Sequence, residues 1–375
     1  MEGKLKIWVM TNEFEPQIIG GLGIVATQLT RMMSTLGAKI TVLCTGNSDR
    51  MTISNANGHL RIIRFPKNSG YFNQAKRSFR AEAIIKGALH KGLGRPDLIH
   101  VHSTEFAETA KLAGSRFHLP IVYTCHSLVS QGSSSPHGKN QTTLIRIANR
   151  VIVPSRWQAQ ETKRRYPWIN GHKMVVIPHG IAPVSKGSTK GASHQLLYVG
   201  RLISSKGVEP LIKAVGLLAR ENSRVQLTIV GSGSASYRNK LRTLAKQAGA
   251  ESRIRWAEKV SHKKVQQMYR SYGAVVNPSK TESFCLVALE AMANGVPLIS
   301  TTSGGMKEFV TPRNAQIIHA VDSAHIARAI KGFWNNPGQS RKRVINARAT
   351  SAQYKWPVIA GKYLSLFAHL KQGRA

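Results

Sequence analysis

Strand-like and helix-like segments alternate along this chain, with a single interruption near its middle. In the first half, apolar runs at Lys4–Thr11 and Lys39–Cys44 flank a helical pattern at Ile24–Leu36. Parallel strands need crossovers of this length, usually a helix. The first half is therefore expected to form a parallel sheet covered by helices on both faces.

The alternation is interrupted at residues 182–194, which are rich in Gly and Ser and have no periodicity, as is typical of a linker. Before this break, further strands are expected at Ile62–Phe65, Leu98–His102, Pro120–Thr124 and Arg150–Pro154. After it, the sequence predicts strands at Gln195–Val199, Val225–Val230, Ile254–Trp256, Gly273–Asn277 and Leu298–Ser300, and helices at Val208–Arg220 and Leu286–Asn294.

These segments predict an α/β protein of two doubly wound, Rossmann-like domains that face each other across a cleft. The first domain is expected at residues 1–181 and the second at 195–354, with the linker at 182–194 between them. Residues 355–375 predict a C-terminal helix, which either caps the second domain or crosses back to the first. Ligands of doubly wound sheets bind beyond the carboxyl ends of the strands, so the site is expected in the cleft.

The chain is strongly basic, because 54 Lys and Arg against 17 Asp and Glu give a formal net charge of +37. This excess favours contact with anionic lipid headgroups, an anionic polymer or nucleic acid, although a solvated basic surface has the same composition. No apolar run is long enough to cross a membrane, and the first residues are typical of a strand rather than a signal peptide. Cys44, Cys125 and Cys285 are widely spaced and fit free thiols in a reducing cytosol. The sequence therefore predicts a cytoplasmic enzyme.

Two glutamates, Glu282 and Glu290, flank the expected start of a helix. Backbone N–H groups at such a start have no helical partner and attract phosphate, and both carboxylates can accept hydrogen bonds from sugar hydroxyls. On spacing alone, a capping acid and a solvated helix residue explain the pair equally well. A second candidate is the loop at 200–207, which follows an expected strand and offers Arg201 and Lys206 to phosphate oxygens.

The distribution of acids argues against a metal site. Asp49, Asp97 and Asp322 are the only aspartates, and no Asp-x-Asp pair exists in the chain. Hard cations prefer clustered carboxylates. The nearest approach to a ligand group is His100 and His102 with Glu105 and Glu108, and no metal is expected there.

Four segments together resemble a known family. Glu282–Glu290, continued as AMANGVPLISTTSGGMKEFV, is similar to the hallmark of the retaining glycosyltransferase family 4, which has the two-domain GT-B fold. The loop GRLISSKG resembles the family's phosphate-binding loop, and NEFEPQIIGGLGIVATQLTRMMSTLGAKITVLC resembles its opening strand, glycine-rich loop and helix. The end, YKWPVIAGKYLSLF, is similar to its closing crossover helix, so the resemblance spans essentially the whole chain.

This resemblance implies a retaining transfer of a sugar from a nucleotide diphosphate sugar to an acceptor, with no cofactor and no metal. It implies that Arg201 and Lys206 neutralise the diphosphate, that Glu290 binds the ribose hydroxyls, and that Glu282 and His126 lie near the transferred sugar. His126 alternatively is a hydrogen-bonded histidine at the end of a strand. The implied catalytic residues are His126, Glu282, Arg201 and Lys206. The implied donor-binding residues are Gly20, Gly21, Arg201, Lys206, Glu282, Ser283, Phe284, Cys285, Leu286, Val287 and Glu290.

Two positions depart from the family pattern. Cys285 stands where glycine is common, and the turn His179-Gly180-Ile181-Ala182 lacks the usual Asn and Asp around its glycine. Because of these two departures, the sequence does not identify the donor sugar. It does not identify the nucleotide base or the acceptor either.

Two basic segments suggest where an anionic partner binds. Nine Lys or Arg lie between Arg61 and Arg95 against one acid, Glu82, and a second run is Lys163–Trp168. Family members that glycosylate lipids use such segments to rest on anionic membranes. The expected partners are a nucleotide-sugar donor, an acceptor that is anionic or bound to a membrane, and the inner face of that membrane as a peripheral contact. The alternatives are a nucleotide-sugar epimerase or hydrolase, or a non-catalytic protein of the same fold that binds polyanions, including nucleic acid.

Overall fold

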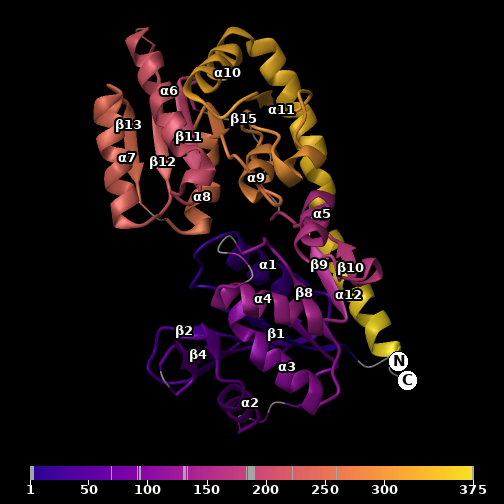
Figure 1. Ribbon diagram of the computed structural model, residues 1–375. Coiled ribbons are helices and arrows are strands. Elements are labelled where there is room, and N and C mark those ends of the chain that lie inside the picture. The colour runs from indigo at the N-terminus through magenta and orange to yellow at the C-terminus, as the bar shows by residue number, and fades with distance from the viewer. Residues whose placement is uncertain are drawn as a thin grey trace. The chain divides into compact units, whose positions relative to one another are not determined.

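A computed structural model describes residues 4–68, 70–90, 92, 94–129, 132, 134–182, 184, 191–221, 223–258 and 260–373. The chain divides into two compact units, residues 1–180 with 356–375, and residues 181–355 (Figure 1). Of the expected linker at 182–194, residues 183 and 185–190 lie outside the described part. Its last residues pack onto the second unit, where the Trp334 indole N–H donates to the carbonyl of Ser193 at 2.9 Å.

In the described part of the first unit, eight strands form a sheet in the order β10-β9-β8-β7-β1-β2-β4-β3. All neighbouring pairs are parallel except β3 and β4. The expected parallel sheet thus has one additional antiparallel edge strand, Thr52–Asn57, which the sequence analysis does not predict because it is exposed throughout, has no core-forming pattern and pairs through a short hairpin. The strands are β1 Lys6–Thr11, β2 Lys39–Gly46, β3 Thr52–Asn57, β4 Leu60–Pro66, β7 Leu98–Val101, β8 Ile121–Thr124, β9 Arg150–Val153 and β10 Met174–Val176.

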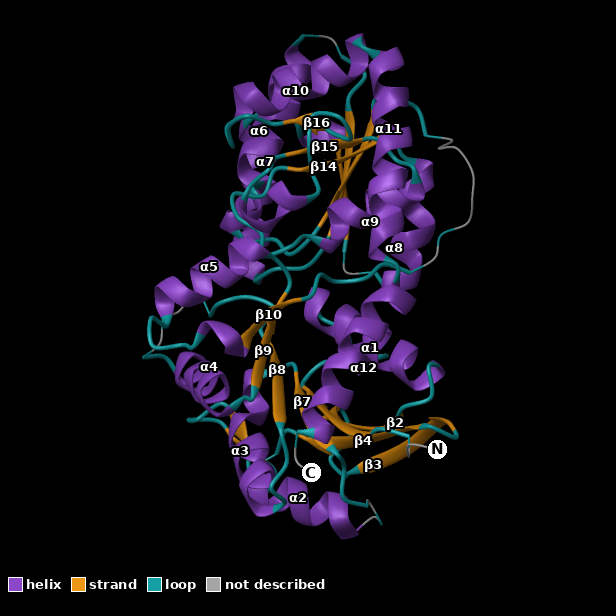
Figure 2. Cartoon of the chain, turned by 90° about the vertical axis from the view of Figure 1, so that its right-hand side faces the viewer, coloured by secondary structure: helices purple, strands orange, loops and turns teal. Residues whose placement is uncertain are grey.

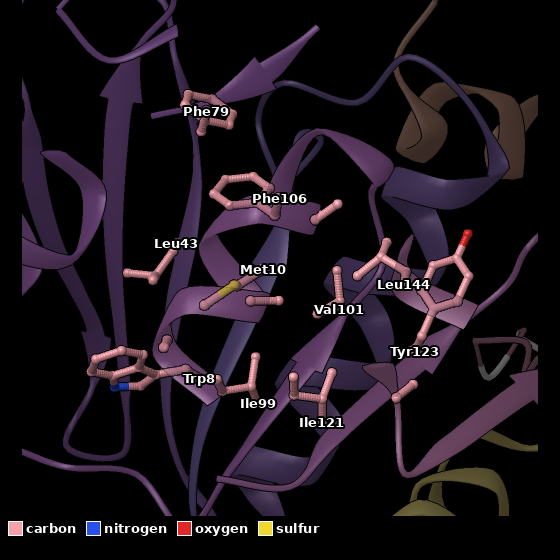
Figure 3. Close-up of a cluster of buried hydrophobic side chains, with 14 of the residues drawn as sticks. Trp8, Met10, Leu43, Phe79, Ile99, Val101, Phe106, Ile121, Tyr123 and Leu144 are labelled. Atoms are coloured by element: carbon pink, nitrogen blue, oxygen red, sulfur yellow. The ribbon is translucent and has the colours of Figure 1, made fainter. Parts of the chain in front are cut away.

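Helices cover both faces of this sheet, as buried parallel strands require (Figure 2). On one face, Trp8, Met10, Val101 and Tyr123 pack with Phe106 in a hydrophobic cluster (Figure 3). This cluster includes residues of α2, α3 and α4. The helices of the unit are α1 Gly21–Thr35, α2 Ala81–His90, α3 Ala107–Arg116, α4 Pro136–Ile147, α5 Arg156–Arg165 and α12 Trp356–Gln372, and β5 Phe72–Asn73 pairs with β6 Ser78–Phe79.

The C-terminal helix belongs to the first unit. Helix α12 contacts α1, and the rings of Tyr363 and Phe367 lie 5.5 and 5.2 Å from the ring of His100 on β7. Lys371 at its end forms an ion pair with Asp97 at 3.1 Å. The helix therefore covers the face of the sheet opposite to α2, α3 and α4.

The second unit has a parallel sheet of six strands within its described residues, in the order β13-β12-β11-β14-β15-β16. Alternate residues of each strand face opposite ways, so Leu196 and Tyr198 pack with α6, α7 and α10, whereas Leu197 packs with α8, α9 and α11. The strands are β11 Gln195–Val199, β12 Gln226–Val230, β13 Ile254–Ala257, β14 Ala274–Asn277, β15 Leu298–Ser300 and β16 Gln316–Ile317. The helices are α6 Val208–Arg220, α7 Ala235–Gln247, α8 His262–Met268, α9 Leu286–Asn294, α10 Ser323–Asn335 and α11 Pro337–Ser351.

Both units are thus Rossmann-like, as the sequence predicts. Among the described residues, no helix is both long and apolar enough to span a bilayer.

Candidate active site

The polar residues of the second unit gather where its strand order reverses. Strands β11 and β14 are parallel neighbours, and each is followed at its carboxyl end by a loop with predicted site residues. Arg201 and Lys206 follow β11, and Glu282 follows β14. A reversal of this kind leaves a crevice beyond the strand ends, which is the usual ligand position in such sheets.

The two loops are joined by an ion pair. The Lys206 ammonium lies 2.6 Å from Glu282 Oε1, and the side chains are only 18% and 13% exposed. Glu282 Oε1 also accepts a hydrogen bond of 2.8 Å from the Ser279 hydroxyl. An ammonium group has three N–H donors, so the contact with Glu282 leaves donors for an anionic ligand. The ion pair with Glu282 therefore holds the Lys206 ammonium in a defined position.

Two glycines allow the loops to approach this closely. Gly207 has a positive φ of 68°, and a Cβ on it would collide with the carbonyl oxygen of Pro278. Gly304 has a φ of 63°, and a Cβ there would collide with the carbonyl oxygen of Glu282. Only glycine meets both demands at these positions. The role of Gly304 was not predicted from sequence, because the loop at Glu282 that it contacts is not adjacent to it in the chain.

Helix α9 starts inside the Glu282–Glu290 segment, as predicted. It begins at Leu286, after Cys285, which takes a positive φ of 80° and has only a weakly accepting thiol for the first amides. Phe284 and Cys285 are buried, and the others of the group, Ser283, Leu286 and Val287, are partly exposed. Burial, followed by the nearby charge of Glu282, raises the pKa of the Cys285 thiol, so it is not a nucleophile at neutral pH. The start of the helix remains able to attract phosphate.

Glu290 is buried and accepts two hydrogen bonds. Its Oε1 lies 2.6 Å from Nε2 of His262, the first residue of α8, and its Oε2 accepts the hydroxyl of Tyr269 at 2.8 Å. The alternative of a solvated helix residue is therefore wrong for Glu290. His262 and Tyr269 were not predicted as site residues. Their spacing puts them about two helical turns apart, but Glu290 belongs to another helix, so no local signal identifies the contact.

The contact with Glu290 also affects protonation. Burial lowers the pKa of His262, and the hydrogen bond and charge of Glu290 raise it by more, so the net pKa is above the usual value. Burial and Glu290 raise the pKa of Tyr269 well above its usual value, so this phenol remains a donor.

The raised pKa of His262 predicts a pH-dependent contribution to stability. The folded protein binds the proton more tightly than the unfolded chain does, so the contribution is fully present below the unfolded value of about 6.5 and disappears as pH rises through the raised folded value. We expect the melting temperature of the protein to exceed that of His262→Gln by more at pH 6 than at pH 9. Thermal unfolding of both proteins at the two pH values measures this; an equal difference contradicts it.

Arg201 is exposed, and its carbonyl accepts a hydrogen bond of 3.1 Å from the Tyr198 hydroxyl. This contact holds the backbone of Arg201 in place. It does not constrain the orientation of the guanidinium. Within the second unit, the structure thus brings Lys206 and Glu282 together in one ion pair, places Arg201 on the same loop as Lys206, and holds Glu290 in a separate hydrogen-bonded group.

In the first unit, the glycine-rich loop is shaped by a buried carboxylate. Glu13 Oε2 accepts the amides of Ile19 and Gly20 at 2.8 and 2.9 Å, just before α1 begins at Gly21. A Cβ on Gly23 would collide with Glu13, whereas a Cβ on Gly20 would meet no atom of the described protein within 4 Å. Gly23 is therefore required by the protein itself. The space beside Gly20 is open.

His126 lies in a row of four neighbouring histidine rings. Its Nε2 lies 2.9 Å from Nδ1 of His102, and ring centroids are 4.2 Å apart for His100 and His102 and 5.2 Å apart both for His102 and His126 and for His126 and His179. Burial lowers the pKa of His126 to about 3, so this imidazole is neutral at physiological pH. It can exchange hydrogen bonds with a hydroxyl group, but it is no source of protons there.

The chain matches the models of two families, and the two matched regions meet near the boundary between the units. Residues 19–184 match "Glycosyltransferase Family 4", and residues 185–350 match "Glycosyl transferases group 1". Curated relatives include a D-inositol 3-phosphate glycosyltransferase of Xylanimonas cellulosilytica, 23% identical with 95% of this chain and 93% of the relative covered. A glycogen synthase of Mycobacterium tuberculosis is 26% identical, with 98% and 96% covered.

Solved structures with the same fold include the sucrose-phosphate synthase of Thermosynechococcus elongatus. It has a TM-score of 0.80 at 22% identity and covers 99% of this chain and 100% of its own. The catalytic domain of starch synthase IV from Arabidopsis thaliana, bound to ADP and acarbose, has a TM-score of 0.78 at 18% identity and covers 99% and 100%. At these identities the likeness shows the fold alone, which is the GT-B fold with two Rossmann-like domains.

Proposed function

Because the chain belongs to the glycosyltransferases of group 1 and family 4, we propose that it transfers a sugar from a nucleotide diphosphate sugar, with retention of configuration and without a metal. That it is a glycosyltransferase follows from the family. The donor class is supported by the starch synthase that was solved with ADP. The stereochemistry and the metal independence of the transfer are tested by the product and EDTA experiments below.

The observation that supports this proposal best is the Lys206–Glu282 ion pair beside the start of α9. A diphosphate that leaves the sugar gains negative charge in the transition state, so a cation held in place lowers the barrier without reorganisation. Lys206 is such a cation, held 2.6 Å from Glu282 Oε1, and Arg201 adds an exposed guanidinium on the same loop. The two cations supply what a divalent metal supplies elsewhere, which supports metal-independent transfer.

Retention is proposed through attack by the acceptor on the face that the leaving group departs from. The departing phosphate oxygen takes the proton of the acceptor hydroxyl, so the new glycosidic bond forms as the old one breaks. This route requires no protein nucleophile. It fits the ion-paired state of Glu282, because a carboxylate held by Lys206 and Ser279 is a poor nucleophile. Neutral His126 would orient a sugar hydroxyl.

A thermal-shift screen with UDP-, GDP- and ADP-sugars tests the donor, since a ligand of the folded state raises the melting temperature by mass action. With the donor identified, NMR of the product gives the anomeric configuration, and an assay in EDTA gives the metal requirement. An inverted product overturns retention, and loss of turnover in EDTA overturns metal independence. A hydrolase or epimerase would consume the donor at the same rate without acceptor.

We further propose that the end of α5 rests on an anionic membrane surface. Of the two basic segments, the one around residues 76–80 has its aromatic residue, Phe79, in the core, so it offers no ring to a bilayer. At Lys163–Trp168, the three cations are exposed and Trp168 is 49% exposed. Exposed cations beside an exposed indole suit the headgroup region.

Vesicle flotation tests this surface. The protein is expected to float with vesicles that contain phosphatidylserine at low salt, and Lys163→Glu/Arg164→Glu is expected to float less. Each basic residue near such a surface contributes about 1 kcal/mol of binding free energy, so the double variant should bind at least about tenfold more weakly. Arg341→Glu/Lys342→Glu changes the charge equally on the exposed face of α11 and is the control. Equal binding to neutral vesicles, or equal loss in the control, contradicts the proposal.

A further inference from the structure

Two hydrogen-bond partners, His262 and Tyr269, hold the Glu290 carboxylate in one orientation. The carboxylate is buried, its Oε1 faces His262 Nε2 at 2.6 Å, and its Oε2 accepts the Tyr269 hydroxyl at 2.8 Å. A further hydrogen bond ties the helix behind it, since the Asn294 amide donates to the carbonyl of Glu290 at 2.9 Å. A carboxylate held at both oxygens cannot rotate about its last bond without breaking a contact.

The remaining lone pairs determine what this carboxylate can bind. Each carboxylate oxygen has two acceptor positions, and His262 and Tyr269 occupy one on each oxygen. Each oxygen therefore keeps the capacity to accept one more hydrogen bond, and together the two oxygens can accept a bidentate pair. Two neighbouring hydroxyls, as on a ribose, match such a pair of acceptors. A single hydroxyl or a phosphate does not.

We propose that His262 is a positioning residue that fixes the Glu290 carboxylate for the two hydroxyls of the donor ribose. This inference rests on the proposed function, in which Glu290 binds the ribose. His262 acts through Glu290. The contact of 2.6 Å requires a proton on Nε2, because an unprotonated nitrogen would repel the carboxylate oxygen at that distance.

Local structure places His262 for this role. Ser261 caps α8 by accepting the amide of Lys264 at 3.3 Å, so His262 is the first helical residue. Its side chain is 18% exposed, in contrast to its exposed neighbour Lys263 on the same helix. A variant at Lys263 therefore changes the helix surface without touching Glu290, and it serves as the matched control.

The test is the affinity for a nucleoside diphosphate and for its 2′,3′-dideoxy analogue, measured by titration calorimetry with the base that the thermal-shift screen selects. His262→Ala is expected to weaken ribonucleotide binding about tenfold, since a hydrogen bond to a charged group is lost. It should leave binding of the dideoxy analogue within about twofold, because the analogue has no hydroxyls for Glu290 to accept. His262→Gln retains an N–H donor and should recover most of the ribonucleotide affinity, and Lys263→Ala should change neither.

Each outcome separates the two hypotheses. Equal weakening of both ligands by His262→Ala, or unchanged affinity for both, overturns the positioning role and leaves the proposed function standing. If no nucleoside diphosphate binds the unaltered protein, the proposed function fails and the positioning role falls with it. Melting curves show whether each variant is folded. If His262→Ala does not fold, the affinities of His262→Gln for the two ligands test the positioning role.

Discussion

Lys206→Ala is expected to lower kcat/KM for donor turnover by about 10²- to 10³-fold, the loss that follows removal of one preorganised charge-stabilising donor. Most of this loss should be in kcat, because the charge of the diphosphate grows as its bond to the sugar breaks. Release of nucleoside diphosphate from the donor found by the screen is the measurement. Lys213→Ala, at an exposed lysine of α6 in the same unit, should have no effect.

Removal of Lys206 also leaves Glu282 without its cation, so a loss of stability must be separated from a loss of catalysis. Glu282 is 13% exposed, and a carboxylate at such a site loses stability when its partner is removed. Lys206→Ala/Glu282→Gln removes both charges and should regain most of the melting temperature without regaining turnover. Turnover within about threefold of the unaltered protein, a difference of about 0.7 kcal/mol in barrier height, would show that the diphosphate does not depend on Lys206.

The order of elements was predictable because it depends on local patterns. Helix α6 at Val208–Arg220, helix α9 at Leu286–Asn294 and strand β11 at Gln195–Val199 have the bounds that the sequence predicts, since apolar period and flanking glycine determine them. Strand β3 was missed because most of its residues are polar and all of them are exposed. Its position depends on pairing with β4, which is a non-local contact.

The site was predictable only in part, for the same physical reason. The sequence of each loop identifies Lys206 and Glu282 as candidates. Their ion pair, however, joins residues 76 positions apart, and it needs Gly207 to let the two loops come close together. The histidine row likewise arises from the ends of two strands, β7 and β8, and the turn at His179, so sequence reasoning identified His126 and not its contact with His102. The fixed orientation of Glu290 depends on a histidine 28 residues away. Side chains that complete a site across elements leave no periodic signal.

Glu290→Gln is expected to weaken ribonucleotide binding by at least about tenfold, and more if both ribose hydroxyls donate to the carboxylate, since each bond to a charged acceptor contributes about 1.5–3 kcal/mol. The substitution keeps the size of a side chain that is 8% exposed, so the core around α9 should remain packed. Calorimetric titration with the nucleoside diphosphate measures the loss. The dideoxy analogue, which lacks the hydroxyls, is the control and should bind both proteins alike.

A second measurement on the same variant shows whether the carboxylate, and not the shape of residue 290, is responsible. In the unaltered protein, Glu290 outweighs the effect of burial and raises the pKa of His262. In Glu290→Gln only burial remains as a large influence, so the pKa of His262 should fall below its usual value. NMR titration of the His262 ring reports this directly. If the His262 pKa falls but ribonucleotide affinity does not, the ion pair is structural and the ribose binds elsewhere. If both fall together, the buried carboxylate is the group that the nucleotide requires.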